Sequence, residues 1–153
     1  MQVRDIMVEP VIVVRQDTPL HEIAQTMLER GIGCVPVVDE RGELQGIITE
    51  SDFTGKERGF PFSAFRAPEV FGAWFGYDDV ERVHQAARER RASEIMTHPV
   101  VTTREDEALT DLVKRMIDRD LKRIPVVRDK TPVGIVARHD LLKLMARTGQ
   151  EQA

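Results

Sequence analysis

The stretch CVPVVDERGELQGIITESD at residues 34–52 occurs a second time, in altered form, as RIPVVRDKTPVGIVARHD at residues 123–140. The match extends outward in both directions. A shift of 89 residues places Val3 on Ala92 and Glu40 on Asp129, and a shift of 88 restores the match after a one-residue deletion near Arg41. The identical pairs are Ile6/Ile95, Met7/Met96, Pro10/Pro99, Val11/Val100, Arg15/Arg104, Asp17/Asp106, Leu20/Leu109, Met27/Met116, Arg30/Arg119, Pro36/Pro125, Val37/Val126, Val38/Val127, Gly46/Gly134, Ile47/Ile135 and Asp52/Asp140. Such a duplication predicts two equivalent units related by pseudo-twofold symmetry.

Both repeats predict the same order of elements. An extended run rich in β-branched residues comes first, at 11–14 and at 100–103. A helix follows, because apolar residues recur at helical spacing. Two short strands come next, at 35–38 and 44–49 in the first repeat and at 124–127 and 133–137 in the second, and residues 39–42 form the first turn. The helical stripes are Leu20, Ile23, Ala24, Met27 and Leu28, and Leu109, Leu112, Val113, Met116 and Ile117.

Helix boundaries are predicted from capping residues. Thr18 is the expected N-cap of the first helix, with Pro19 at its first helical position and Gly31 as its stop. A second helix is expected to begin at the aspartate that ends each repeat, and it is clearest at Asp140, which can cap it.

Residues 54–91 separate the repeats. All the aromatic residues lie between Phe53 and Tyr77, and residues 77–91 predict a charged amphipathic helix with Val80, Val83, His84 and Ala87 on one face. The aromatic stretch 60–77 is expected to form a small satellite core. A dimer contact, a lid over a ligand cleft and a partner-docking patch are the alternatives.

The composition limits the classes of function. A chain of 153 residues fits one soluble globular domain, and its net charge of -4 makes nucleic-acid binding an unfavoured function. One cysteine excludes an internal disulfide and a cysteine-based metal site, and the four histidines have no paired ligand spacing, so no metal site is expected. No apolar run is long enough to span a bilayer and residues 1–9 do not resemble a signal peptide, which predicts a cytoplasmic protein without a membrane partner.

The repeated stretches, together with Asp5-Ile6-Met7 and Glu94-Ile95-Met96 before them, resemble two CBS motifs. The resemblance places motif 1 at 3–53, the insert at 54–91 and motif 2 at 92–148. It implies an α/β (α+β) fold of two βαββα units that form a single CBS-pair (Bateman) module over residues 1–153. Such modules are usually dimers, so a homodimer is expected.

The same resemblance implies two clefts for an adenosine nucleotide. The first would use Thr18 and Gly33 with Arg123, Ile135, Ala137 and Asp140, and the second Glu107 and Lys122 with Cys34, Ile47, Thr49 and Asp52. A carboxylate at a helix start can accept hydrogen bonds from ribose hydroxyls, and free N–H groups there attract phosphate.

Each cleft departs from the pattern of the family. Ala137 stands where the first cleft expects a hydroxyl, and Cys34 stands where the second expects an arginine, although Lys122 can supply positive charge. Glu107 would repel a phosphate. The alternatives are that Asp52 and Asp140 only cap helices, that Arg123 is a solvated charge and that Cys34 is a small buried hydrophobe.

The expected function is therefore a non-catalytic module that senses AMP, ADP or ATP, requires no cofactor, has no catalytic residues and regulates a separate, unknown protein. One alternative is another adenosyl ligand such as S-adenosylmethionine, and another is a structural or partner-docking dimer with empty clefts. A small nucleotide-acting enzyme is the least favoured, because the chain has no nucleophile–base pattern and no Gly-x-x-x-x-Gly-Lys phosphate loop.

Overall fold

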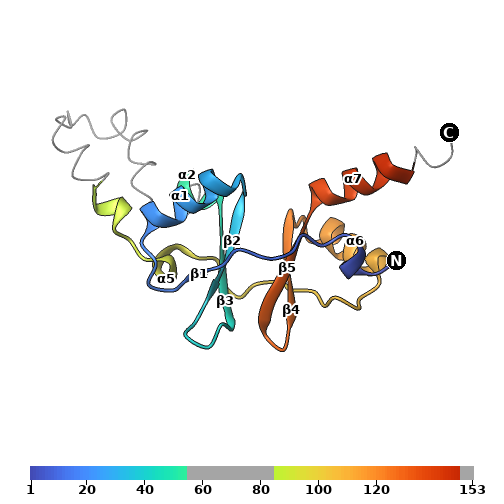
Figure 1. The fold of residues 1–153 in the computed structure, drawn as a ribbon, viewed down its shortest axis with the longest axis horizontal. Coiled ribbons are helices and arrows are strands. Elements are labelled where there is room, and N and C mark those ends of the chain that lie inside the picture. The colour runs from blue at the N-terminus through green and yellow to red at the C-terminus, as the bar shows by residue number, and fades with distance from the viewer. Residues whose placement is uncertain (55–84, 149–153) are drawn as a thin grey trace.

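The computed structural model describes residues 1–54 and 85–148, which form two similar lobes side by side (Figure 1). The first lobe contains β1 (Val14–Arg15), α1 (Leu20–Arg30), β2 (Cys34–Val38), β3 (Leu44–Thr49) and α2 (Glu50–Thr54). The second contains α6 (Leu109–Asp118), β4 (Arg123–Arg128), β5 (Thr131–Ala137) and α7 (Arg138–Thr148). Two short helices, η1 (Val3–Asp5) and α5 (Ala92–Ile95), begin the two repeats. The predicted α/β fold of two related units is confirmed.

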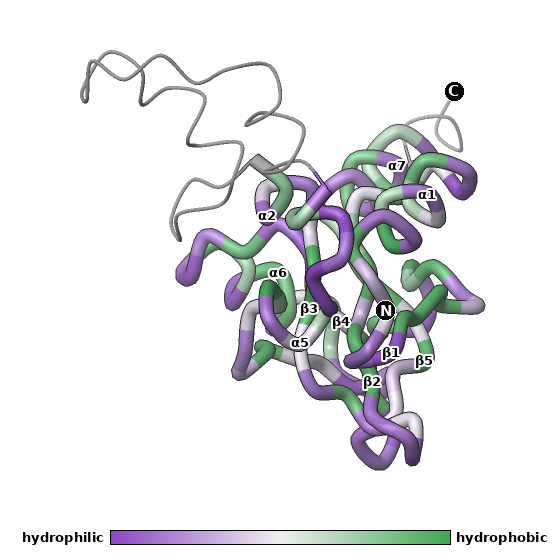
Figure 2. The backbone as a smooth tube through the Cα atoms, turned by 90° about the vertical axis from the view of Figure 1, so that its left-hand side faces the viewer, coloured by the Kyte–Doolittle hydropathy of each residue, from purple (hydrophilic) through white to green (hydrophobic). Residues whose placement is uncertain are grey.

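Each lobe is organised around an antiparallel hairpin. β2 pairs with β3, and β4 pairs with β5, with a register shift at Val37/Val38 and at Val126/Val127, which are equivalent positions in the two repeats. In the first lobe β1 adds a parallel strand beside β2. Both hairpin turns are hydrophilic and lie at the end away from α1 and α7 (Figure 2). The bases of the hairpins, where Cys34 and Arg123 begin their strands, lie at the helical end.

The predicted extended runs form less strand than expected. In the first repeat only Val14–Arg15 pairs with β2, and in the second Thr103 makes a single parallel bridge to Val126. The helical stripes point inward over most of their length, with Leu20, Ile23 and Met27 buried in the first lobe. The last residue of each stripe does not point inward. Leu28 is 84% exposed and its equivalent Ile117 is 70% exposed, so both lie outside the core.

Three predicted helix boundaries are wrong. The N-cap of α1 is Pro19, because the Thr18 hydroxyl turns back and accepts the Arg15 N–H at 3.0 Å. α2 and α7 begin two residues before Asp52 and Asp140, so each aspartate lies inside the first turn of its helix. Gly31 does end α1, with a left-handed φ of 62° that a glycine adopts without strain.

The segment that leads each repeat packs into the other lobe. Val3 is fully buried in the second core with Leu112 and Ile124, although it belongs to the first repeat. Ala92, Ile95 and Met96 lead the second repeat but lie in the first core. Figure 1 shows the N-terminal segment beginning beside α6 and crossing to β1. The boundaries of the repeats are therefore not the boundaries of the two cores.

Close backbone contacts hold each leading segment where it passes over a hairpin strand of the lobe into which it packs. Val8 bridges Ile135 and its equivalent Thr97 bridges Ile47, in both cases antiparallel. A Cβ at Gly46 would lie 2.7 Å from the Met96 Cγ, so a glycine is needed where the leading segment passes over β3. At Gly134 the same atom would lie 3.1 Å from the backbone oxygen of Val8.

Most of the insert lies outside the described residues, including the aromatic stretch 60–77 and the residues Val80, Val83 and His84. Residues 85–88 are helical, as predicted, and Ala87 is 2% exposed within the first core. Phe53, the first of the aromatic residues, packs partly buried against the same core.

Candidate functional site

Gly33 and Arg123, from opposite repeats, are in contact where the two hairpins meet. The Arg123 guanidinium lies so close to the Gly33 Cα that a Cβ added there would be 2.9 Å from Cζ and would overlap Nη2. Gly33 therefore leaves the space that the guanidinium occupies. Its carbonyl accepts the first N–H of α2, from Glu50, at 3.2 Å, and the Lys122 carbonyl accepts that of α7, from Arg138, at 3.0 Å.

Asp140 is connected to the backbone of Arg123 through Ala137. Ala137 is opposite Arg123 in the β4–β5 register, and its backbone N–H donates to Asp140 Oδ2 at 2.8 Å. Asp140 is only 8% exposed, and its Oδ1 is 3.6 Å from Lys143 Nζ. One carboxylate oxygen thus closes the start of α7, while the other faces a single lysine at a distance too long for a hydrogen bond.

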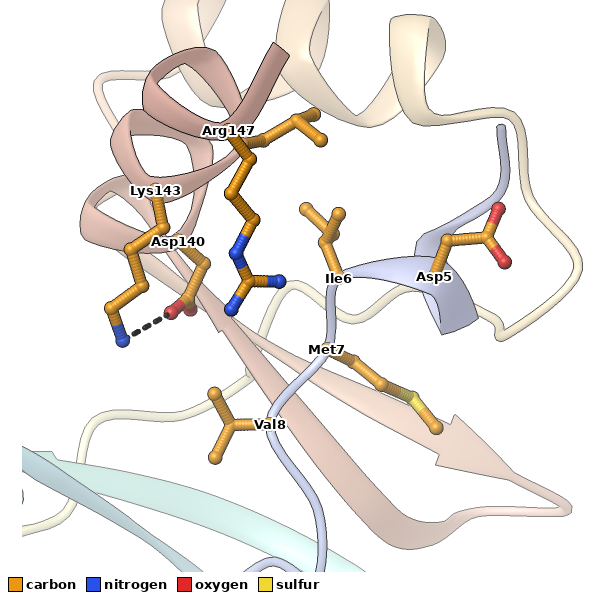
Figure 3. A pocket seen from close by; sticks show the side chains of 8 residues that line it. Asp5, Ile6, Met7, Val8, Asp140, Lys143 and Arg147 are labelled. Atoms are coloured by element: carbon orange, nitrogen blue, oxygen red, sulfur yellow. Dashed lines mark ion pairs between the residues drawn. The ribbon is translucent and has the colours of Figure 1, made fainter. Parts of the chain in front are cut away.

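A pocket of about 250 Å³ opens beside Asp140, between α7 and the N-terminal segment (Figure 3). Only Asp140 of the predicted first cleft lines it. The other lining residues were not predicted as site residues: they are Asp5, Ile6, Met7, Val8, Lys143, Leu144 and Arg147. One signal was present in the sequence, because Lys143 and Arg147 follow Asp140 at spacings of three and seven and so share its helical face.

Ile135 and Ile47 can offer a ligand only their side chains. The Ile135 carbonyl accepts the Val8 N–H at 2.8 Å, and its own N–H donates to the Val8 carbonyl at 3.1 Å. Ile47 makes the same pair of bonds with Thr97. These backbone groups hold the crossing segments, which leaves the isoleucine side chains as apolar walls.

Thr18 is tied to other parts of the structure. Its hydroxyl accepts the Arg15 N–H and its carbonyl accepts the Ala92 N–H at 2.9 Å. These contacts hold the leading segment of the second repeat on the first lobe, and none of them joins Thr18 to Arg123 or Asp140.

The second predicted cleft repeats the aspartate arrangement. Asp52 Oδ2 accepts the Thr49 N–H at 2.7 Å, and the Thr49 hydroxyl lies 3.3 Å from the same oxygen. Cys34 is opposite Thr49 in the β2–β3 register and is buried. Burial raises the pKa of the Cys34 thiol to about 11, although the nearby Arg123 acts in the opposite direction. The position that would carry an arginine therefore carries a neutral thiol at physiological pH.

Glu107 forms an ion pair with Arg115, which reduces the repulsion expected between Glu107 and a phosphate. Arg115 donates to Glu107 Oε1 and, at 2.7 Å, to the Thr102 carbonyl, while the buried Thr103 hydroxyl donates to Glu107 Oε2 at 2.7 Å. Lys122, the predicted cation of this cleft, is exposed.

Residues 1–54 and 85–148 contain neither a cluster of metal ligands nor a membrane-spanning helix. In that part of the chain no cluster of three or more His, Cys, Asp or Glu side chains could hold a metal ion. Nor does any helix there have the length and apolar character needed to cross a bilayer.

Comparison with known proteins identifies the same repeats. The CBS domain family matches residues 3–58 and 92–147. An uncharacterized protein of Methanopyrus kandleri, MK0525, is 35% identical over 124 residues, which cover 80% of this chain and 52% of that protein. The chain therefore spans about half the length of this relative.

Two solved structures share the fold closely. The CBS domain of a CBS domain containing membrane protein from Sphaerobacter thermophilus is 45% identical, with a TM-score of 0.74, and the match covers 94% of this chain and 86% of that one. The CBS domain pair of protein MJ0100, solved in complex with 5′-methylthioadenosine and S-adenosyl-L-methionine, is 28% identical, with a TM-score of 0.70 and coverage of 97% and 98%.

Proposed function

The chain belongs to the CBS domain family as a pair of CBS domains, a regulatory type of module, and we propose that it binds an adenosine nucleotide (AMP, ADP or ATP) beside Asp140 without transforming it. The observation that carries this proposal is the nearly buried Asp140 carboxylate with one oxygen free of backbone hydrogen bonds, on the wall of a pocket of about 250 Å³. The adenosyl ligands of MJ0100 support the same class of ligand.

The geometry suggests a role for each group. Asp140 Oδ1 accepts hydrogen bonds from the ribose hydroxyls, displacing the long contact to Lys143. Arg123, which reaches Gly33 across the interface between the lobes, pairs with a phosphate. The apolar residues of the N-terminal segment form a wall for the purine, and Ile135 holds Val8 in place through its backbone bridge. Ala137 contributes only its backbone, because its N–H is already bonded to Asp140.

The module would transmit a signal because the ligand contacts segments of both repeats. The pocket is lined by α7 on one side and by the leading segment Asp5–Val8, from the other repeat, on the other. A ligand held between them favours the state in which the leading segment of the first repeat lies against α7 of the second repeat, and a partner protein can read that change in population.

A structural dimer is the second candidate. Leu28, Ile117, Leu142 and Met145 are apolar, strongly exposed and lie on α1, α6 and α7. We propose that a second copy of the chain covers these residues, since exposed apolar side chains gathered on helices mark interaction surfaces.

Thermal unfolding with a panel of adenosyl ligands tests the proposal. A ligand at about 100 times its Kd adds about 2.7 kcal/mol of stability, which is several degrees in Tm for a domain of this size. Asp140→Asn is the decisive variant, because the amide oxygen still accepts the Ala137 N–H while an NH₂ group replaces the oxygen offered to ribose. Asp52→Asn is the matched change in the second cleft. Loss of the shift in Asp140→Asn alone supports the proposal, and no shift with any ligand favours the structural dimer.

A further inference from the structure

Two cations extend the Asp140 pocket along α7. Lys143 and Arg147 both line the pocket, and Figure 3 shows their side chains on the same side as Asp140, with the Arg147 guanidinium directed toward Asp140 and Val8. The opposite wall is apolar and consists of Ile6, Met7 and Val8. A ligand whose ribose bonds Asp140 would thus have two positive groups within the same pocket.

We propose that Lys143 and Arg147 form an anion subsite that makes this pocket select phosphorylated adenosyl ligands over the positively charged sulfonium of S-adenosylmethionine. The inference rests on the proposed function, because it assumes that an adenosyl ligand occupies the pocket. It assigns the choice between the two ligand classes to two side chains on α7.

The two cations are available for a ligand. Within residues 1–54 and 85–148, the Arg147 side chain makes no hydrogen bond or ion pair, and the Lys143 side chain has one ionic contact, at 3.6 Å to Asp140 Oδ1. When ribose hydroxyls take that oxygen, Lys143 loses its contact and can turn to a phosphate. A phosphate oxygen accepts charge-assisted hydrogen bonds from both groups, whereas a sulfonium is repelled by them.

The acidic residues of the pocket do not cancel this charge. Asp140 is committed to the Ala137 N–H and to the sugar. Asp5 is turned to the far side of the pocket in Figure 3, where its Oδ2 accepts the Gln2 N–H at 2.7 Å. The charge that faces the remaining space is therefore positive.

The two cations occur in only one of the two repeats. The shift of 88 residues that aligns Asp140 with Asp52 aligns Lys143 with Gly55 and Arg147 with Gly59. Neither equivalent residue of the first repeat carries a charge. The pair thus distinguishes the Asp140 cleft from its equivalent.

Calorimetric titration of the full chain with adenosine, AMP and S-adenosylmethionine tests the inference. The variants are Arg147→Gln and Lys143→Gln, with Lys114→Gln, an exposed lysine of α6 that does not line the pocket, as the matched control. We expect each pocket variant to raise the Kd for AMP about tenfold and to leave adenosine within about twofold, because a charge-assisted hydrogen bond is lost only with the phosphate. S-adenosylmethionine should bind equally well or better, and Lys114→Gln should change nothing.

Other results separate the two proposals. Unchanged AMP binding in both pocket variants, or equal losses for AMP and adenosine, would overturn the anion subsite even where Asp140→Asn abolishes binding and upholds the nucleotide site. Tighter wild-type binding of S-adenosylmethionine than of AMP would overturn it too. Absence of binding by all three ligands would overturn the proposed function and the subsite with it.

Discussion

The Arg123 guanidinium occupies the space that a side chain at Gly33 would fill, and the two residues come from opposite repeats. The repeat does not produce this contact twice. The residues equivalent to Gly33 and Arg123 are Lys122 and Cys34, which are neither a glycine nor an arginine. The two repeats therefore differ at this contact, because Arg123 is charged and its equivalent, Cys34, is neutral.

Gly33→Ala should weaken nucleotide binding without unfolding the protein. The added methyl meets the far end of a flexible arginine, which can move aside, and Gly33 has no left-handed φ to strain an alanine. We expect the free energy of unfolding to change by less than about 1 kcal/mol. The Kd for AMP should rise about tenfold, since Arg123 leaves its position. Urea denaturation and calorimetry measure the two quantities, and a large loss of stability with unchanged binding contradicts this role.

Val3→Ala should destabilise the second lobe although Val3 belongs to the first repeat. Val3 is fully buried with Leu112 and Ile124, so removing its methyl groups leaves a cavity. The expected cost is about 1–3 kcal/mol in urea denaturation. Val13→Ala, a partly exposed valine of the same repeat, is the matched control and should cost about 0.5 kcal/mol or less. Equal effects of the two changes would show that the leading segment contributes little to the second core.

The stability of the protein should depend on Cys34 at alkaline pH. The pKa of its thiol is raised by burial from 9.0 to about 11, so between these values the unfolded chain releases a proton that the folded chain retains. The contribution is fully present below pH 9 and is lost as the pH rises to 11, by about 2–3 kcal/mol. The difference in unfolding free energy between wild type and Cys34→Ala, measured at pH 8 and pH 11, isolates this effect. A constant difference means that the thiol ionises equally in both states.

Charged residues at the exposed helix positions should dissociate the proposed dimer. Leu28 and Ile117 are equivalent residues, both strongly exposed, so Leu28→Glu with Ile117→Glu places four new carboxylates in a twofold interface. Light scattering after size exclusion should give a dimer for the wild type and a monomer for the double variant. Val13→Glu, outside the helices, should remain dimeric. A wild type that is monomeric at all concentrations rules out this surface as a dimer interface.

The hairpins were predictable from the sequence to within two residues at each end. Residues 44–49 form β3 as expected, because a run that ends in three β-branched residues lies between a turn and the start of a helix. The caps were less predictable. A threonine before a proline looks like an N-cap, but the Thr18 hydroxyl bonds the turn behind it instead. The direction of one hydroxyl decides between the two arrangements, and propensity does not encode that direction.

Two features of the candidate site could not be predicted. Self-comparison shows that Val3 resembles Ala92, but similarity does not reveal into which lobe each segment packs. Lys143 and Arg147 share a helical face with Asp140 at the level of sequence, yet the same spacing fits a solvated surface. Only the position of the N-terminal segment opposite α7 turns that face into the wall of a pocket.

The crossing of the leading segments also bears on how such a chain could have arisen. A single repeat lacks the residues that complete its own core, since Val3 fills the second lobe and Ala92 the first. An ancestor with one repeat would have had to fold as two copies that exchanged these segments. Gene duplication and fusion would then have placed the two copies in one chain. Their association became intramolecular, with a far higher effective concentration. Once joined, the two halves were free to diverge, and one came to carry the cations that the other lacks.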